Sequence, residues 1–401
     1  MLHETISLSD IKSAYRRIRH EIVKTPCPES IPLSEITGST VFCKLDNLQR
    51  TGSFKERGAR NALLRLNQRH RKKGVVAASA GNHALGLAYH GGLLGIPVTV
   101  VMPEGAPLIK ITTCKRLGAH VVIQGKDFNE ANNEAEKIAL SGPTYIHGFE
   151  NSDVIAGQGT IGLEILSQVN SLDAIVCPVG GGGLIAGLSL AVKSINPKIK
   201  IIAVESIFTG QLTAAFKANK PILVPRRQTL ADGLATLKLG KLPFEIMKSR
   251  IDQIIKVDEK WISLAILRML ELEKIVVEGA AAVPLAALMS GQISGLKGKR
   301  VALVVCGGNI DPQTLSRVIE KGLAHDGRIT QFTATIKDKP GGLSELCTVI
   351  ASCGANINQI SHDRVFSGPN ISEAKVLCTV ETRDHAHGLL LKRLLTRSHF
   401  L

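Results

Sequence analysis

Aromatic residues and long apolar runs are what this sequence has least of. Phe, Trp and Tyr together make up 3% of the 401 residues. This is too few for a base-stacking surface, so we expect no nucleic-acid partner although the formal net charge is +15. We interpret the basic excess as solvated surface that helps to attract anionic substrates. No apolar run reaches the roughly eighteen residues of a membrane span, so no membrane partner is expected.

Paired cysteines and an apolar leader are missing as well. The eight cysteines are scattered, without a Cys-x-x-Cys pair or a compact Cys/His cluster. A disulfide framework and a zinc site are therefore not expected. Residues 1–20 have mixed charge and lack the apolar centre of a signal peptide. Together these absences favour a reducing, cytoplasmic location.

What the sequence does contain is a repeated α/β pattern from about residue 41 to about residue 325. Short apolar runs are each followed by a glycine-containing turn and a segment of helical periodicity. Strands that are apolar on both faces are typical of a parallel sheet covered by helices. The predicted strands are 41–45, 75–79, 98–102, 121–125, 174–180, 200–205 and 301–308.

The pattern changes at the polar joint 324-AHDGR-328. Residues 329–365 then read as strand, turn, helix and strand, and a further strand over 374–382 and a helix over about 384–396 follow. This βαββα order, with the last strand missing, predicts a small ferredoxin-like module. We therefore predict two domains, residues 1–325 and 329–401.

Lys55, in 51-TGSFKERGAR-60, is the first candidate for chemistry. Ser53 and Glu56 have capping-box spacing, which predicts a helix that begins at Ser53. Lys55 would then lie in the first turn, where the helix dipole lowers the pKa of its ammonium group. A lysine that is more easily neutral suits a Schiff base with an aldehyde. The alternative is a surface lysine that extends into water.

The second candidate is 180-GGGGLIAG-187, which follows an apolar strand and opens a helix. Gly180, Gly181, Gly182 and Gly183 allow a tight turn that presents several N–H groups at a helix N-terminus. Such a turn predicts a phosphate-binding loop. It is neither a Walker A motif nor a dinucleotide GxGxxG motif.

The third candidate is the strand-to-helix turn in 78-ASAGNHALGLA-88. Ser79, the N–H groups of residues 80–82 and the Asn82 amide form a turn rich in donors, which suits a carboxylate or a phenolate. We interpret His83 as a structural residue of the first helical turn.

The fourth candidate is Cys306, at a strand end in 305-VCGGNID-311. It is a catalytic thiolate, a packed core residue or a weak polar partner for a ligand. No acid–base partner is evident nearby, so we reject the thiolate. One ligand would account for all four candidates, because pyridoxal 5′-phosphate combines an aldehyde, a phosphate and a heteroaromatic ring.

These motifs resemble those of the fold-type II pyridoxal-phosphate enzymes, and closely those of the threonine dehydratases (threonine ammonia-lyases). The resemblance implies two parallel-sheet subdomains of the tryptophan-synthase-β-like type, of which the smaller, at about 45–150, is mobile. The C-terminal residues resemble an ACT regulatory domain through 337-KDKPGGLSEL-346 and 354-GANINQISHDR-364. The other matching stretches are 44-KLDNLQRTGSFKERGA-59, 78–88, 153-DVIAGQGTIGLEIL-166, 178–187, 278-EGAAA-282 and 306–322.

The resemblance also implies a role for each candidate. Lys55 would bond to the cofactor aldehyde and later remove the substrate Cα proton, and Phe54 would lie against the cofactor ring. Asn82 would hold the phenolic oxygen, Gly180–Gly183 the phosphate, and Cys306 would face the pyridine nitrogen. The substrate carboxylate would be held by Ser79, Ala80, Gly81, Asn82 and His83. A monovalent or divalent cation would bind near Glu205 and 231-ADGLA-235.

The implied reaction is conversion of L-threonine to 2-oxobutanoate and ammonia, with L-serine giving pyruvate. Serine racemases resemble this chain but carry serine where it has Ala80, so little racemisation is expected. The alternatives are a serine racemase, a hydroxyaspartate ammonia-lyase and a non-catalytic amino-acid sensor. An amino-acid effector at the ACT-like module and a homodimer or homotetramer are expected. The choice between isoleucine biosynthesis and threonine breakdown stays open.

Overall fold

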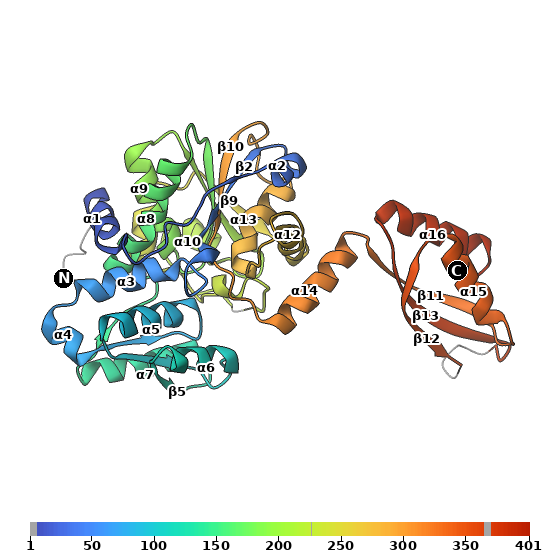
Figure 1. Cartoon of the computed structure of the whole chain (residues 1–401), viewed down its shortest axis with the longest axis horizontal. Coiled ribbons are helices and arrows are strands. Elements are labelled where there is room, and N and C mark those ends of the chain that lie inside the picture. Colours follow the sequence, from blue (N-terminus) through green and yellow to red (C-terminus); the bar gives the residue numbers. More distant parts are fainter. Residues whose placement is uncertain (1–5, 226, 365–369) are drawn as a thin grey trace. The chain divides into compact units, whose positions relative to one another are not determined.

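The computed structural model describes residues 6–225, 227–364 and 370–401 (Figure 1). The chain separates into two compact units, Met1–Ile310 and Asp311–Leu401. The division lies before the joint expected at 324–328, because helix α14 (Pro312–His325) groups with the second unit. No helix of the described residues is long and apolar enough to cross a membrane.

The larger sheet of the first unit has six strands in the order β1-β2-β10-β7-β8-β9. Only β1 pairs antiparallel, and the other neighbours are parallel, as predicted. The middle strands are buried along almost their whole length because helices cover both faces. Strand β9 was not predicted because Gln253 and Lys256 interrupt its apolar residues. The strands are β1 (Glu29–Ser30), β2 (Thr40–Leu45), β7 (Ala174–Pro178), β8 (Lys200–Ser206), β9 (Gln253–Val257) and β10 (Arg300–Val305).

The smaller sheet of the first unit is parallel throughout, in the order β5-β4-β3-β6. Its strands are β3 (Val75–Ala78), β4 (Val98–Met102), β5 (His120–Ile123) and β6 (Thr144–Tyr145). Side chains alternate along β3, so Val75 and Ala77 pack with α5 (Asn82–Leu94) while Val76 and Ala78 pack with α7 (Phe128–Leu140). The sheet is thus covered on both faces, and its mobility stays a prediction.

The remaining helices of the first unit surround these sheets, with α8 and α9 packed side by side (Figure 1). They are α1 (Leu8–Ile18), α2 (Ile31–Thr37), α3 (Lys55–Arg65), α4 (Gln68–Lys73), α6 (Leu108–Arg116), α8 (Ser152–Gln168), α9 (Gly183–Ile195), α10 (Gln211–Ala218), α11 (Lys241–Met247), α12 (Glu259–Leu272) and α13 (Gly279–Met289), with the 3-10 turns η1 (Asp46–Leu48) and η2 (Asp232–Leu234).

A buried cluster of charges fixes α3 against its neighbours. Arg57 on α3 bonds to Asp46 of η1 at 2.6 Å and to Glu164 of α8 at 2.7 Å. Lys44 of β2 bonds to the same Glu164 at 2.6 Å. Because all four side chains are buried, their opposite charges must compensate one another where water is excluded. The cluster holds the helix that begins at Lys55.

After α14, the second unit has the predicted βαββα order. Its three strands form an antiparallel sheet in the order β11-β13-β12. Strand β13 alternates, so that Ala374, Val376, Cys378 and Val380 are buried. The elements are β11 (Ile329–Lys337), α15 (Gly342–Ser352), β12 (Asn356–Asp363), β13 (Glu373–Glu381) and α16 (His385–Arg397).

Candidate active site

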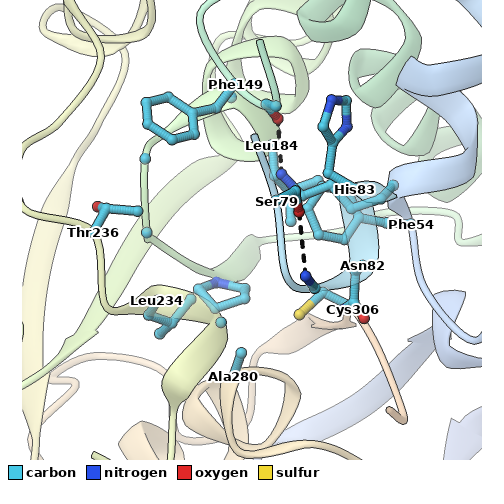
Figure 2. Close-up of a pocket in the computed structure, with 18 of the residues that line it drawn as sticks. Phe54, Ser79, Asn82, His83, Phe149, Leu184, Leu234, Thr236, Ala280 and Cys306 are labelled. Atoms are coloured by element: carbon cyan, nitrogen blue, oxygen red, sulfur yellow. Dashed lines mark hydrogen bonds between the residues drawn. The ribbon is translucent and has the colours of Figure 1, made fainter. Parts of the chain in front are cut away.

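A cavity of about 240 Å³ lies in the first unit, at the carboxyl ends of strands from both of its sheets. Phe54, Asn82 and Cys306 stand on one side of it, and Phe149 and Thr236 on the other (Figure 2). Strand ends of parallel sheets are where α/β folds place ligands. Of the predicted residues, the cavity lining includes Phe54, Lys55, Ser79, Ala80, Gly81, Asn82, His83, Gly180, Gly181, Gly182, Gly183 and Cys306.

The predicted capping box is wrong. Helix α3 begins at Lys55 with Phe54 as its N-cap, and no side chain caps it. The buried Ser53 hydroxyl has no hydrogen-bond partner among the described residues, and the Ser53 backbone bridges to Gly307 instead. Glu56 turns away to accept from the Thr51 N–H and from His90 at 3.0 Å. The Ser53 backbone pairing with Gly307 and the Glu56 bonds to Thr51 and His90 have therefore replaced the reciprocal bonds of the predicted capping box.

The Lys55 amine donates to the Gly148 carbonyl at 2.8 Å. Burial lowers the pKa of Lys55 to about 8, against the opposing influence of Cys306 and Glu278. The predicted lowering of the pKa is thus in the right direction, but its main cause is burial and not the helix dipole. An amine of this kind is available as a nucleophile and a base near neutral pH.

The tetraglycine loop links β7 to α9, which begins at Gly183. In the described structure, the N–H groups of residues 180–184 donate to no protein acceptor. A Cβ on Gly181 would lie 2.3 Å from the Phe149 ring, and Gly182 has a φ of +95°. Side chains are therefore excluded, and the free N–H groups at the start of a helix form a fitting site for a phosphate.

The turn between β3 and α5 also offers donors. The N–H groups of Ala80, Asn82 and His83 donate to no acceptor in the described structure, and Gly81 donates to the Ser79 hydroxyl at 3.2 Å (Figure 2). His83 bonds to the Ile146 carbonyl at 3.0 Å, and burial lowers its pKa to about 3. His83 is therefore neutral and fixed, which agrees with its interpretation as a structural residue.

Cys306 directly follows β10, and 2% of its surface is exposed. Burial raises the pKa of its thiol well above the ordinary value. The protonated thiol is no nucleophile, and it offers a neutral contact to a ring nitrogen.

Glu205 lies away from the cavity lining. Its carboxylate accepts from the N–H groups of Leu212 and Thr213 at 2.9 and 3.1 Å, at the start of α10, and lies 3.9 Å from the Lys256 amine. Among the described residues no group of three or more His, Cys, Asp or Glu is placed to hold a metal ion. The structure thus gives Glu205 a helix-capping role, and the cation stays a prediction.

Three residues that shape the site were not predicted from single motifs: Glu278, Asn309 and Phe149. Glu278 precedes α13 and accepts from the Asn82 amide, while Asn309 donates to the same amide at 2.9 Å. Phe149 packs on the tetraglycine loop. Glu278 and Asn309 lie in the matching stretches 278-EGAAA-282 and 306–322. The spacing of these stretches in the sequence does not show that the two residues meet at Asn82.

An amine with a lowered pKa, a loop of free N–H groups and a protonated thiol around one cavity suit a ligand that carries an aldehyde, a phosphate and a ring. The family model "Pyridoxal-phosphate dependent enzyme" matches residues 18–307. The chain belongs to this family, and its cofactor is pyridoxal phosphate.

The comparisons also identify similar proteins. The L-threonine ammonia-lyase of Thermotoga maritima is 44% identical over 391 residues, which cover 97% of each chain. Threonine deaminase isoform 2 from Solanum lycopersicum is 35% identical, with a TM-score of 0.74 over 78% of this chain and 92% of that chain. Serine racemase from Dictyostelium discoideum is 37% identical, with a TM-score of 0.72 over 76% of this chain and 99% of that chain.

Proposed function

We propose that this protein is a threonine ammonia-lyase, which converts L-threonine to 2-oxobutanoate and ammonia and L-serine to pyruvate. The proposal rests on the charges of the side chains that line the cavity. Among the described residues that line it, Lys55 is the one cation, while Asp232 and Glu278 are acids. Burial lowers the pKa of His83 to about 3 and that of His147 to about 4, so neither histidine adds positive charge. A small amino acid with a neutral β-hydroxyl suits this cavity.

The same charge distribution disfavours a hydroxyaspartate ammonia-lyase. A second substrate carboxylate would need a cationic partner, because burying an unpaired charge is costly. The described lining offers none beyond Lys55. The names of the threonine-acting relatives, 44% and 35% identical to this chain, support the same choice.

Bound pyridoxal phosphate supplies an electron sink for the electrons of the Cα–H bond. In our proposal Lys55 would hold the cofactor through its aldehyde and later, when its amine is free again, would remove the substrate Cα proton. The N–H groups of Gly180–Gly183 would hold the phosphate, Asn82 would hold the ring oxygen, and the turn at residues 79–83 would hold the substrate carboxylate. Phe54 and Cys306 would contact the ring, with Cys306 at its nitrogen. These residues line one cavity, which supports the assignment.

A product assay tests the proposal. Purified protein loaded with pyridoxal phosphate is given L-threonine, and 2-oxobutanoate and ammonia are both quantified, with Lys55→Ala as the control. We expect equal amounts of the two products and none from the control. If cofactor-loaded wild-type protein forms no oxo acid, threonine is not its substrate. A non-catalytic amino-acid sensor would give the same result.

Racemisation of serine is the second candidate activity, because a serine racemase is 37% identical to this chain. The Ala80 methyl group lines the cavity and has no proton to give to the opposite face of the cofactor. We expect wild-type protein to form little D-serine from L-serine and Ala80→Ser to form more. Equal D-serine formation by both proteins, measured by chiral chromatography, would contradict this role.

For the second unit we propose an effector role. The turn from β11 to α15 ends at Gly341, and the N–H groups of Leu343 and Ser344 donate to no acceptor in the described structure. Such a helix start suits the carboxylate of an amino-acid effector; the alternative is a purely dimerising module. We further propose a cytoplasmic homodimer or homotetramer.

A further inference from the structure

Glu278 is a buried carboxylate that touches the cavity but has no role in the proposed reaction. It is 5% exposed and directly precedes α13. Its two oxygens accept from the Asn82 Nδ2 group at 2.9 and 3.0 Å. Asn82 begins α5 beside the smaller sheet, whereas α13 packs on strands of the larger sheet. The contact therefore joins the two halves of the site at the residue proposed to hold the ring oxygen.

The orientation of the Asn82 amide follows from a chain of donors and acceptors. The Thr51 carbonyl can only accept, so the Asn309 group that bonds to it at 2.7 Å is Nδ2. The same Nδ2 donates to Asn82 Oδ1 at 2.9 Å. Asn82 must then present Nδ2 to Glu278, because a flipped amide would set oxygen against the carboxylate.

This arrangement leaves one donor for a ligand. Both Glu278 oxygens lie at similar distances from a single nitrogen, so one N–H is shared between them. The second N–H of Asn82 remains, in a residue that lines the cavity. An ionised carboxylate also polarises the amide and makes the remaining N–H a better donor.

We propose that Glu278 is a positioning residue, whose carboxylate holds the Asn82 amide so that its second N–H serves the ring oxygen of bound pyridoxal phosphate. The inference rests on the proposed role of Asn82. Glu278 acts through Asn82 and touches no reacting atom. Asn309 fixes the other end of the Asn82 amide, because its Nδ2 group donates to Asn82 Oδ1.

The charges around Glu278 make its effect depend on pH. The pKa of Glu278 is raised to about 7, chiefly by burial and also by Asp232, against the lowering influence of the Asn82 bond, Lys110 and the Asn309 backbone. Lys55 and the Cys306 thiol interact electrostatically with Glu278 as well. Below about pH 7 the carboxyl takes up a proton and loses half of its acceptor capacity. Cofactor binding should therefore weaken as the pH falls through this range.

Glu278→Gln tests the proposal through cofactor binding instead of turnover. Protein stripped of cofactor is titrated with pyridoxal phosphate between pH 6 and pH 9, and the dissociation constant and the visible absorption spectrum are recorded. We expect roughly tenfold weaker binding at pH 8 in the variant, the scale of one lost charge-assisted bond. We also expect the spectrum to lose its pH dependence near pH 7. Glu278→Asp, which restores the charge, should regain part of that dependence.

Glu259→Gln is the matched control. Glu259 accepts from Ser206, Thr229 and the Leu230 N–H outside the cavity lining, so this variant should keep the wild-type pH dependence of the spectrum. If Glu278→Gln lowers the melting temperature but leaves the dissociation constant and the spectrum unchanged, Glu278 is only structural and the proposal is refuted. None of these readouts uses threonine. A wild-type protein that forms no 2-oxobutanoate would therefore refute the proposed function and leave this inference standing.

Discussion

At the scale of single residues, the reactivity of Lys55 depends on the protein around it. Burial lowers its pKa to about 8. Only the neutral amine attacks an aldehyde, and a lysine is neutral above its pKa. The rate at which stripped protein captures pyridoxal phosphate should therefore rise with pH and level off above about pH 8. Stopped-flow absorbance at a series of pH values measures this rate, and a rise that continues to the ordinary lysine pKa would show that burial has no such effect.

Gly181 is a position where a single methyl group should matter. A Cβ there would lie 2.3 Å from the Phe149 ring, which cannot yield without entering the cavity or disturbing the loop. We expect Gly181→Ala to cost about 1–3 kcal/mol of stability, as overpacking does, and to weaken cofactor binding. Thermal unfolding and cofactor titration measure the two effects.

Gly105→Ala is the control for this substitution, because a Cβ on Gly105 meets no atom within 4 Å. In a Phe149→Ala background, Gly181→Ala should cost less stability than it does in the wild type, since the ring that the methyl group strikes is gone. An equal cost in both backgrounds would show that the contact with Phe149 is not the cause.

At the scale of elements, helix α3 depends on its buried charges. Removing Arg57 leaves Asp46 and Glu164 buried with one cation, Lys44, between them. Breaking a buried ion pair in this way costs about 3–5 kcal/mol. Arg57→Ala should therefore unfold at a much lower temperature than the wild type.

Arg65→Ala offers a comparison on the same helix. Arg65 pairs with Asp153 at 3.2 Å, and 58% of the Arg65 side chain is exposed. Exposed pairs contribute at most about 1 kcal/mol, so this variant should unfold near the wild-type temperature. Calorimetry on both proteins gives the difference, and equal melting temperatures would mean that the buried cluster does not stabilise α3.

At the scale of the whole molecule, the cavity belongs to one unit. All of its lining residues lie within Met1–Ile310, and the family model ends at residue 307. A chain ended at Ile310 should therefore bind pyridoxal phosphate and release 2-oxobutanoate from threonine, but lose any response to an amino-acid effector. Absorbance and product assays on the shortened and full-length proteins test this. A shortened protein that folds but binds no cofactor would show that the second unit completes the site.

Much of the fold could be predicted from the sequence, because the patterns that indicate strands and helices are local. Apolar runs such as those of β7 and β10 are buried on both faces, and the alternation of β13 marks a sheet with one covered face. Strand β9 was not predicted, because Gln253 and Lys256 interrupt its apolar residues. The start of α3 was misplaced by two residues, because Glu56 bonds to His90, which lies far away in the sequence.

Local patterns in the sequence predict the kinds of group at the site: a lysine at the start of a helix, four glycines after a strand, a donor-rich turn and a cysteine at a strand end. Their types and backbone positions follow from local spacing. Tertiary structure alone decided how those groups behave. Burial sets the pKa of Lys55 and Cys306, and the meeting of Asn82 with Glu278 and Asn309 fixes one amide. Solvent exclusion and contacts between distant segments exist only in the folded chain, so local spacing does not contain them.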